Sequence, residues 1–61
     1  MKQRDLIKKI TQEGAILLRH GGNHDWYRNP LSGVSQPVPR HREIHQFLAQ
    51  HIIRKLGKNS K

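Results

Sequence analysis

Residues 21–30 hold the side chains of this chain that are best suited to chemistry. Two glycines and an asparagine precede His24, which begins a short run rich in strand-forming residues, and the run ends at Asn29-Pro30, a dipeptide that starts turns. Glycine takes positive φ at no steric cost, so this pattern predicts a tight reversal that holds His24 at the rim of a sheet. Histidine is the side chain that ordinarily exchanges a proton near neutral pH. A general base acting on the 2′-hydroxyl of RNA, with cations on the phosphate, is enough for transesterification; the alternative is a solvated loop histidine.

The alternation of side chains along the strand that follows the reversal predicts which residues lie on the same face as His24. Side chains alternate across a strand, so His24, Trp26 and Arg28 share one face, and Asp25 and Tyr27 share the other. An imidazole, an aromatic platform and a guanidinium in a row suit RNA, because bases stack on aromatic rings and arginine pairs with phosphate. We therefore expect Trp26 on an open face and Tyr27 against the core, with the opposite arrangement of these two residues as the alternative.

Metal and cofactor chemistry has little support in the sequence. His41 and His45 are four residues apart, a spacing that can bind a metal on a helix, but no third ligand stands at an obvious position and the chain has no cysteine. A solvated helix start is the better interpretation, and we expect no metal. The chain contains no Ser-His-Asp arrangement, phosphate-binding glycine loop or dinucleotide fingerprint, so no small-molecule cofactor is expected either.

Net charge is the strongest compositional feature. The 61 residues include 12 Lys and Arg against 4 Asp and Glu, which gives a net charge of +8. Such a surface attracts polyanions, above all nucleic acid, although a solubilising surface or an acidic protein partner would also account for it. The chain shows no apolar run long enough to span a membrane and no secretory signal, so we expect a cytoplasmic protein.

Hydrophobic spacing predicts two helices and three strands. The first helix covers residues 4–13, with Leu6, Ile7 and Ile10 on one stripe and Gly14 as its cap. Short strands are predicted at residues 15–19, 24–28 and 34–38. Because proline cannot donate to a ladder, Pro37 marks either an edge strand or the end of the third strand. A second helix ends at a capping glycine, Gly57, and residues 58–61 form a frayed polar tail.

The second helix has the clearest apolar stripe. Its predicted core residues are Ile44, Leu48, Ile52 and Leu56, widened by Phe47, Ala49 and Ile53. The resulting fold class is α+β, a single domain over residues 1–61 with α-β-β-β-α order, in which two amphipathic helices cover one face of a three-stranded antiparallel sheet and leave the other open. Double-stranded-RNA-binding domains use this arrangement, but a fold alone does not establish a function.

These residues together resemble a known family, the HicA toxins, small bacterial RNA-cleaving proteins of type II toxin–antitoxin pairs. The similarity runs in order along nearly the whole chain, through Gly14, Arg19-His20-Gly21-Gly22-Asn23-His24, Tyr27-Arg28-Asn29-Pro30, Pro37-Val38-Pro39-Arg40-His41, Glu43-Ile44 and Leu56-Gly57. The family usually has Gly-Ser-His or Gly-Thr-His at the glycine turn, and Asn23 here replaces the hydroxyl residue.

The resemblance implies the double-stranded-RNA-binding-like fold, His24 as the catalytic residue, and a cognate HicB antitoxin that covers it. It makes the expected function a metal-independent endoribonuclease acting on mRNA. From the residues themselves we add Arg19, Arg28 and Arg40 as candidate phosphate contacts and Trp26 as a stacking surface. The rival hypotheses are a non-catalytic RNA-binding module of the same fold and an inactive family member kept as an antitoxin partner.

Overall fold

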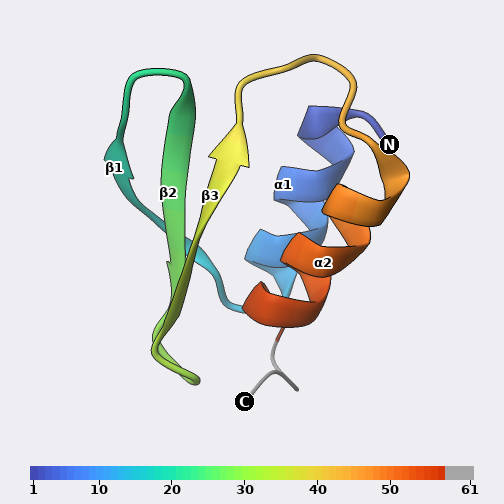
Figure 1. Ribbon diagram of the computed structural model, residues 1–61. Helices are drawn as coiled ribbons and strands as arrows, with labels where there is room; N and C mark the ends of the chain where they lie inside the picture. The colour runs from blue at the N-terminus through green and yellow to red at the C-terminus, as the bar shows by residue number, and fades with distance from the viewer. Residues whose placement is uncertain (58–61) are drawn as a thin grey trace.

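The computed structural model describes residues 1–57 and contains two helices and three strands (Figure 1). In chain order these are α1 (Gln3–Gln12), β1 (Ile16–His20), β2 (His24–Asn29), β3 (Val34–Pro39) and α2 (Gln46–Leu56). The strands form one antiparallel sheet in the order β1-β2-β3. The predicted α+β class and α-β-β-β-α order are therefore confirmed, whereas the predicted tail, residues 58–61, lies outside the described residues. Neither helix is long and apolar enough to cross a membrane.

The first helix ends as its sequence predicts. Leu6 and Ile10 are buried. Gly14 then takes a φ of +105°, a left-handed conformation that glycine adopts without strain. The N–H of Gly14 donates to the carbonyl of Thr11 at 3.1 Å, and the N–H of Ala15 donates to that of Ile10 at 3.0 Å. These bonds satisfy the last carbonyls of the helix and direct the chain into β1.

The hydrophobic core lies between the helices and the two strands nearest to them. α2 packs against β3 and β2, and α1 packs against α2 (Figure 1). Tyr27 is 8% exposed and belongs to this core, while its neighbour Trp26 is only half-buried. The strand register that places Tyr27 inward is therefore confirmed. The buried apolar side chains are Leu6, Ile10, Ala15, Tyr27, Val38, Ile44, Ala49, Ile52 and Leu56.

Two residues predicted in the core stripe of the second helix are on the surface instead. Phe47 is 75% exposed and Leu48 is 42% exposed. The helix begins later than its stripe suggested, at Gln46, where the ring of His45 accepts the N–H of Phe47 at 3.2 Å. Ala49, Ile52 and Leu56 face inward, since residues three and four apart share a helix face. At 3.6 residues per turn, Leu48 lies at the margin of this face and Phe47 lies nearly opposite to it. Ile44 is buried as predicted, but it precedes the helix.

Strand β1 is apolar and yet contributes no side chain to the core. Ile16, Leu17 and Leu18 are 52%, 44% and 51% exposed. The helices lie on the β3 side of the sheet, and β1 lies beyond β2 at the far edge (Figure 1). Packing within residues 1–57 therefore leaves these three side chains partly in water.

A buried asparagine joins the two layers at the other end of the sheet. Asn29 is fully buried, and its Nδ2 donates to the carbonyl of Glu13 at 3.0 Å and to that of Leu56 at 2.8 Å. Its Oδ1 accepts the N–H of Leu31 at 2.9 Å. One amide thus satisfies a carbonyl at the end of each helix and ties both helix ends to the end of β2.

The first prediction concerns this amide. Asn29→Asp keeps the shape but replaces the donating NH₂ with a carboxylate, which leaves two carbonyls without their donor and places a charge in the interior. We expect a loss of several kcal/mol, since each unsatisfied buried group costs about 1–3 kcal/mol, and a domain of this size has only roughly 3–9 kcal/mol in total. Urea unfolding measures this loss. Asn23→Asp, the same change at an exposed turn residue, is the control, and equal stability of the two variants would refute the role of Asn29.

Candidate functional site

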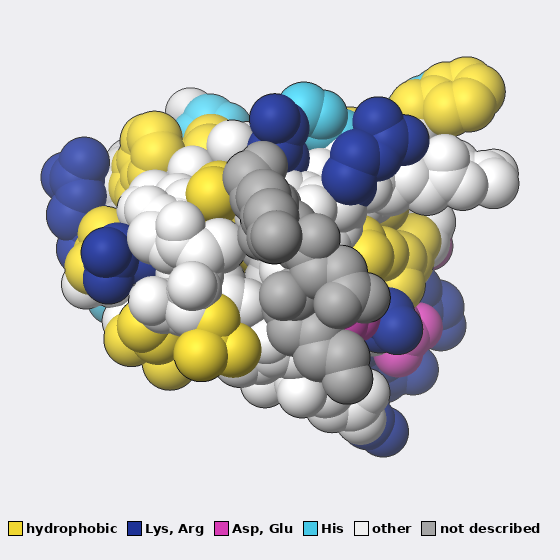
Figure 2. Space-filling model, turned by 90° about the horizontal axis from the view of Figure 1, so that it is seen from below, with side chains coloured by type: hydrophobic (Ala, Val, Ile, Leu, Met, Phe, Trp, Pro, Cys, Tyr) yellow, Lys and Arg dark blue, Asp and Glu magenta, His cyan; other side chains and the backbone are white. Residues whose placement is uncertain are grey.

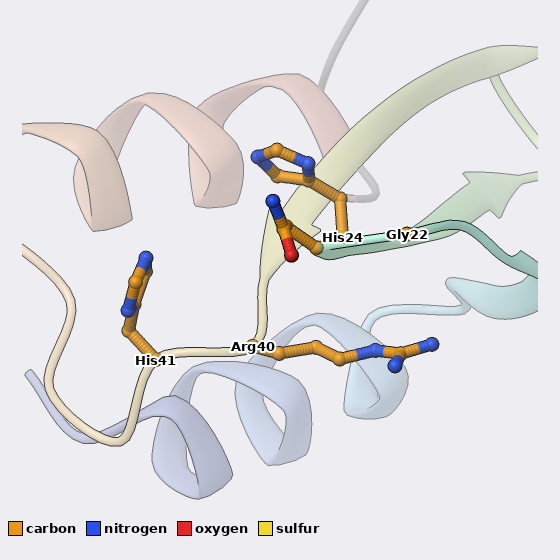
Figure 3. A pocket seen from close by; sticks show the side chains of 5 residues that line it. Gly22, His24, Arg40 and His41 are labelled. Atoms are coloured by element: carbon orange, nitrogen blue, oxygen red, sulfur yellow. The ribbon is translucent and has the colours of Figure 1, made fainter.

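His24 lies at the first position of β2, and its side chain is exposed. It lines a surface hollow of about 480 Å³ together with Gly22, Asn23, Arg40 and His41 (Figure 3). The hollow lies where the β1–β2 turn meets the end of β3, because His24 pairs with Pro39 in the sheet and the N–H of Arg40 donates to the carbonyl of Asn23 at 3.2 Å. The predicted position of His24 at the rim of the sheet is confirmed.

The reversal before His24 is tight for a different reason from the one predicted. Neither Gly21 nor Gly22 has a positive φ. The N–H of Gly21 donates to the carbonyl of His24 at 2.7 Å, and a Cβ on Gly21 would lie 2.8 Å from that carbonyl oxygen. Glycine is required here by the close approach of two backbone segments, and not by a left-handed conformation.

A group of charged side chains holds this turn against the end of β3. The Nδ1 of His20 bonds Oδ1 of Asp25 at 2.8 Å. Nε of Arg40 donates to the same oxygen at 2.9 Å, and Nη2 of Arg40 forms an ion pair with it at 2.8 Å. Nη2 of Arg40 also donates to the carbonyl of Gly21 at 3.0 Å. We call His20, Asp25 and Arg40 the turn clamp, since they connect the ends of all three strands beside His24.

The turn clamp changes the acidity of its carboxyl group. Hydrogen bonds from His20 and then from Arg40 hold the pKa of Asp25 below its usual value of 3.8, because both stabilise the ionised form. Asp25 faces the covered side of the sheet, where its side chain is 14% exposed. By contrast, burial raises the pKa of Tyr27 above 10.0, so its hydroxyl stays neutral in the core.

The open face of the sheet carries the other predicted RNA contacts. Trp26 and Arg28 follow His24 at alternate positions of β2, and Arg19 pairs with Trp26 across β1. The Arg19 guanidinium lies 5.6 Å from the centre of the indole ring, within the range of a cation–π interaction. Arg28 lies at the far end of this face, about 13 Å from His24 at the usual rise per strand residue.

Arg19 reaches this face only because β1 is irregular. Leu17 pairs with Tyr27 and Arg19 pairs with Trp26, so two steps along β1 correspond to one step along β2. This bulge moves Arg19 to the opposite face from the one that simple alternation gives. Without the bulge, Arg19 would oppose Asp25 on the covered side.

The structure therefore brings together some predicted site residues and separates others. His24 and Arg40 line one hollow, whereas Arg19, Trp26 and Arg28 lie along the open face beyond it. The guanidinium of Arg40 is already bonded to Asp25 and Gly21, so in this structure it holds the turn in place.

Sequence reasoning missed three residues near His24. Asp25 and His20 belong to the turn clamp, and His41 lines the hollow. The predicted position of Asp25 on the covered face could have indicated the turn clamp, since a carboxylate removed from water requires a charged or hydrogen-bonding partner. His41 and His45 do not share a helix face, because both precede α2. Among residues 1–57, no three His, Asp or Glu side chains are grouped so that they could hold a metal ion.

Basic side chains do not form one stripe on the face of the molecule that is seen from below (Figure 2). Figure 2 shows Lys and Arg side chains around the margin of the face seen from below, with acidic side chains confined to one side. The charge of +8 therefore raises the potential over the molecule as a whole.

Fold and site together define a small α+β protein with two helices on one side of an antiparallel sheet and an exposed imidazole beside a basic hollow at the strand ends. The chain matches the family model described as HicA toxin of bacterial toxin–antitoxin over residues 3–58, which is nearly its whole length. It belongs to the HicA toxin family, and it is accordingly the toxin component of a toxin–antitoxin system, with a cognate antitoxin as its partner. No curated protein and no solved structure matches the chain.

The second prediction concerns the pH dependence of the turn clamp. Because the pKa of Asp25 is lower in the folded state, its stabilising contribution is present above the unfolded value of 3.8 and is lost as the pH falls through the folded value. We expect Asp25→Asn to be less stable than the wild type at neutral pH, with a difference that shrinks well below pH 3.8. Urea unfolding at both pH values tests this. Asp5→Asn, the same change at an exposed residue of α1, should show no comparable effect, and a constant Asp25→Asn difference at both pH values would contradict the assignment.

Proposed function

We propose that this toxin is a metal-independent endoribonuclease that cleaves mRNA in the cytoplasm, with His24 as its general base. The observation that carries the proposal is the placement of His24, an exposed imidazole on a turn that the turn clamp holds in place, facing a hollow wide enough to admit a nucleotide. Rigid placement matters because a general base acts only within hydrogen-bonding reach of the proton that it removes.

The proposed reaction uses the nucleophile that RNA already carries. His24 removes the proton of a 2′-hydroxyl, and the oxygen attacks the adjacent phosphorus. Negative charge grows on the phosphate oxygens during the attack, so cations close to them stabilise the transition state. Arg40 lies at the hollow, and its side chain is 44% exposed, which leaves part of its guanidinium accessible to a phosphate.

The open face of the sheet would hold the strand on either side of the cleaved bond. Trp26 offers an aromatic surface to a base, and Arg19 and Arg28 offer guanidinium groups to phosphates, all on the face that His24 shares. Arg19 already stacks on Trp26, so a bound base would either displace it or extend the stack. A HicB-like antitoxin would inhibit by covering His24 and this face.

The third prediction tests His24. His24→Ala should lower the rate of RNA cleavage by about 10²–10⁴-fold, the usual contribution of a general acid or base, and should leave the melting temperature unchanged because the side chain is exposed. RNA integrity is measured in a cleavage assay that contains EDTA, and growth is measured in cells that express the protein. His51→Ala, which removes an exposed imidazole from α2, is the matched control. Cleavage at the wild-type rate by the His24 variant would contradict the catalytic role of His24, and absence of cleavage by the wild type would favour the RNA-binding module or the inactive family member.

The fourth prediction tests the open face. In a cleavage-dead His24→Ala background, Trp26→Ala should weaken RNA binding about 5- to 150-fold, since base stacking is worth about 1–3 kcal/mol per base. Fluorescence anisotropy with labelled RNA measures the affinity. Stability should fall much less than in Tyr27→Ala, because Tyr27 is in the core and large aromatic truncations there cost about 3–5 kcal/mol. Unchanged RNA affinity in the Trp26 variant would remove the stacking role.

A further inference from the structure

A second imidazole shares the hollow with His24. His41 lines the same hollow, is exposed, and follows β3 by two residues. His24 pairs with Pro39, and the backbone bond from Arg40 to Asn23 continues the pairing beyond β3. Within the sheet Pro39 shares the face of His24, and His41, two residues beyond Pro39, lines the hollow together with His24. Figure 3 shows the two imidazoles extending in a similar direction from two separate segments, whereas the Arg40 side chain runs away from them.

The two imidazoles differ from the other histidines of the chain. His20 is bonded to Asp25, His45 caps α2, and His51 lies on the exposed surface of α2. Within residues 1–57, the side chains of His24 and His41 make no hydrogen bond or ion pair, so their ring nitrogens are available to a ligand.

The segment that carries His41 is fixed relative to His24. Arg40, the residue between Pro39 and His41, is tied to the turn before His24 by its backbone N–H and by its guanidinium, which bonds Asp25 and the carbonyl of Gly21. The turn clamp therefore sets the position of both imidazoles at once. One imidazole comes from the start of β2 and the other from the segment after β3, so they flank the hollow from two different segments.

We propose that His41 is the general acid of this site, a proposal that rests on the proposed cleavage of RNA by His24. Cleavage of a ribose phosphodiester needs two proton transfers on opposite sides of the phosphorus, since the attacking and leaving oxygens lie roughly in line. His24 takes the 2′-hydroxyl proton as the new O–P bond forms. The bond from phosphorus to the 5′-oxygen breaks, its electron pair stays on that oxygen, and His41 supplies the proton that neutralises it. The products are a 2′,3′-cyclic phosphate and a 5′-hydroxyl, and solvent restores the protonation of both exposed imidazoles.

The fifth prediction separates this acid from a residue that only binds RNA. The substrates are two short RNA oligonucleotides that differ at one linkage, where one has the normal 5′-oxygen and the other a bridging 5′-sulfur. A thiolate leaves without protonation, because a thiol is far more acidic than an alcohol, so the sulfur substrate needs no general acid. His41→Ala should cleave the oxygen substrate about 10²–10⁴-fold more slowly than the wild type and the sulfur substrate at nearly the wild-type rate. His24→Ala should be slow on both.

Each other outcome has a definite meaning. Wild-type cleavage of the oxygen substrate by His41→Ala, with His24→Ala inactive, overturns the role of His41 and leaves the proposed function intact. Equal slowing of both substrates in His41→Ala also overturns it, because that pattern indicates binding. Full activity of His24→Ala overturns the proposed function itself. His51→Ala is the control for loss of an imidazole, and His41→Asn, judged by the same rates, replaces the alanine variant if that one fails to fold.

Discussion

The alternation of side chains along β2 is the constraint on which the rest of the structure depends. The inward residues make three different contacts with the remainder of the chain, and the outward residues remain accessible to a ligand. Asp25 bonds the other two residues of the turn clamp, Tyr27 packs in the core, and Asn29 bonds both helix ends. A shift of the register by one residue would exchange the two sets and destroy the core and the site together.

The turn clamp and the buried amide act at opposite ends of this strand. The turn clamp holds the β1–β2 turn to the segment after β3, so it positions the hollow without occupying the face where a ligand would bind. The amide of Asn29 holds the helices in place at the other end. The hollow and the amide that ties the helix ends thus lie at opposite ends of β2, with the core around Tyr27 between them.

The core is small, and one strand of the sheet is left out of it. Among residues 1–57, nine buried apolar side chains form the core, and none comes from β1. β1 is held mainly by its ladder to β2 and by the bond between His20 and Asp25. In so small a domain each buried contact is a large fraction of the total stability, so the fully buried amide of Asn29 matters more than its size suggests.

The sequence by itself determined the element order, the first helix cap, the inward position of Tyr27 and the exposed position of His24. All of these follow from local rules, because hydrophobic periodicity, turn chemistry and strand alternation act over a few neighbouring residues. The family resemblance directed attention to His24 for the same reason, since its motifs are short and contiguous.

Only the tertiary structure decided what surrounds His24. Arg40 is far enough from His20 and Asp25 in the sequence that no spacing rule connects it to them, and it meets them only because the turn between β1 and β2 folds against the end of β3. The bulge that turns Arg19 toward Trp26 leaves no sequence signal, since one extra residue in a ladder depends on the partner strand. The exposure of Phe47 and Leu48 likewise depended on which side of α2 packs against β3 and β2. The position of His41 beside His24 is a contact between two segments, and contacts of that kind are set by packing, which a single sequence does not display.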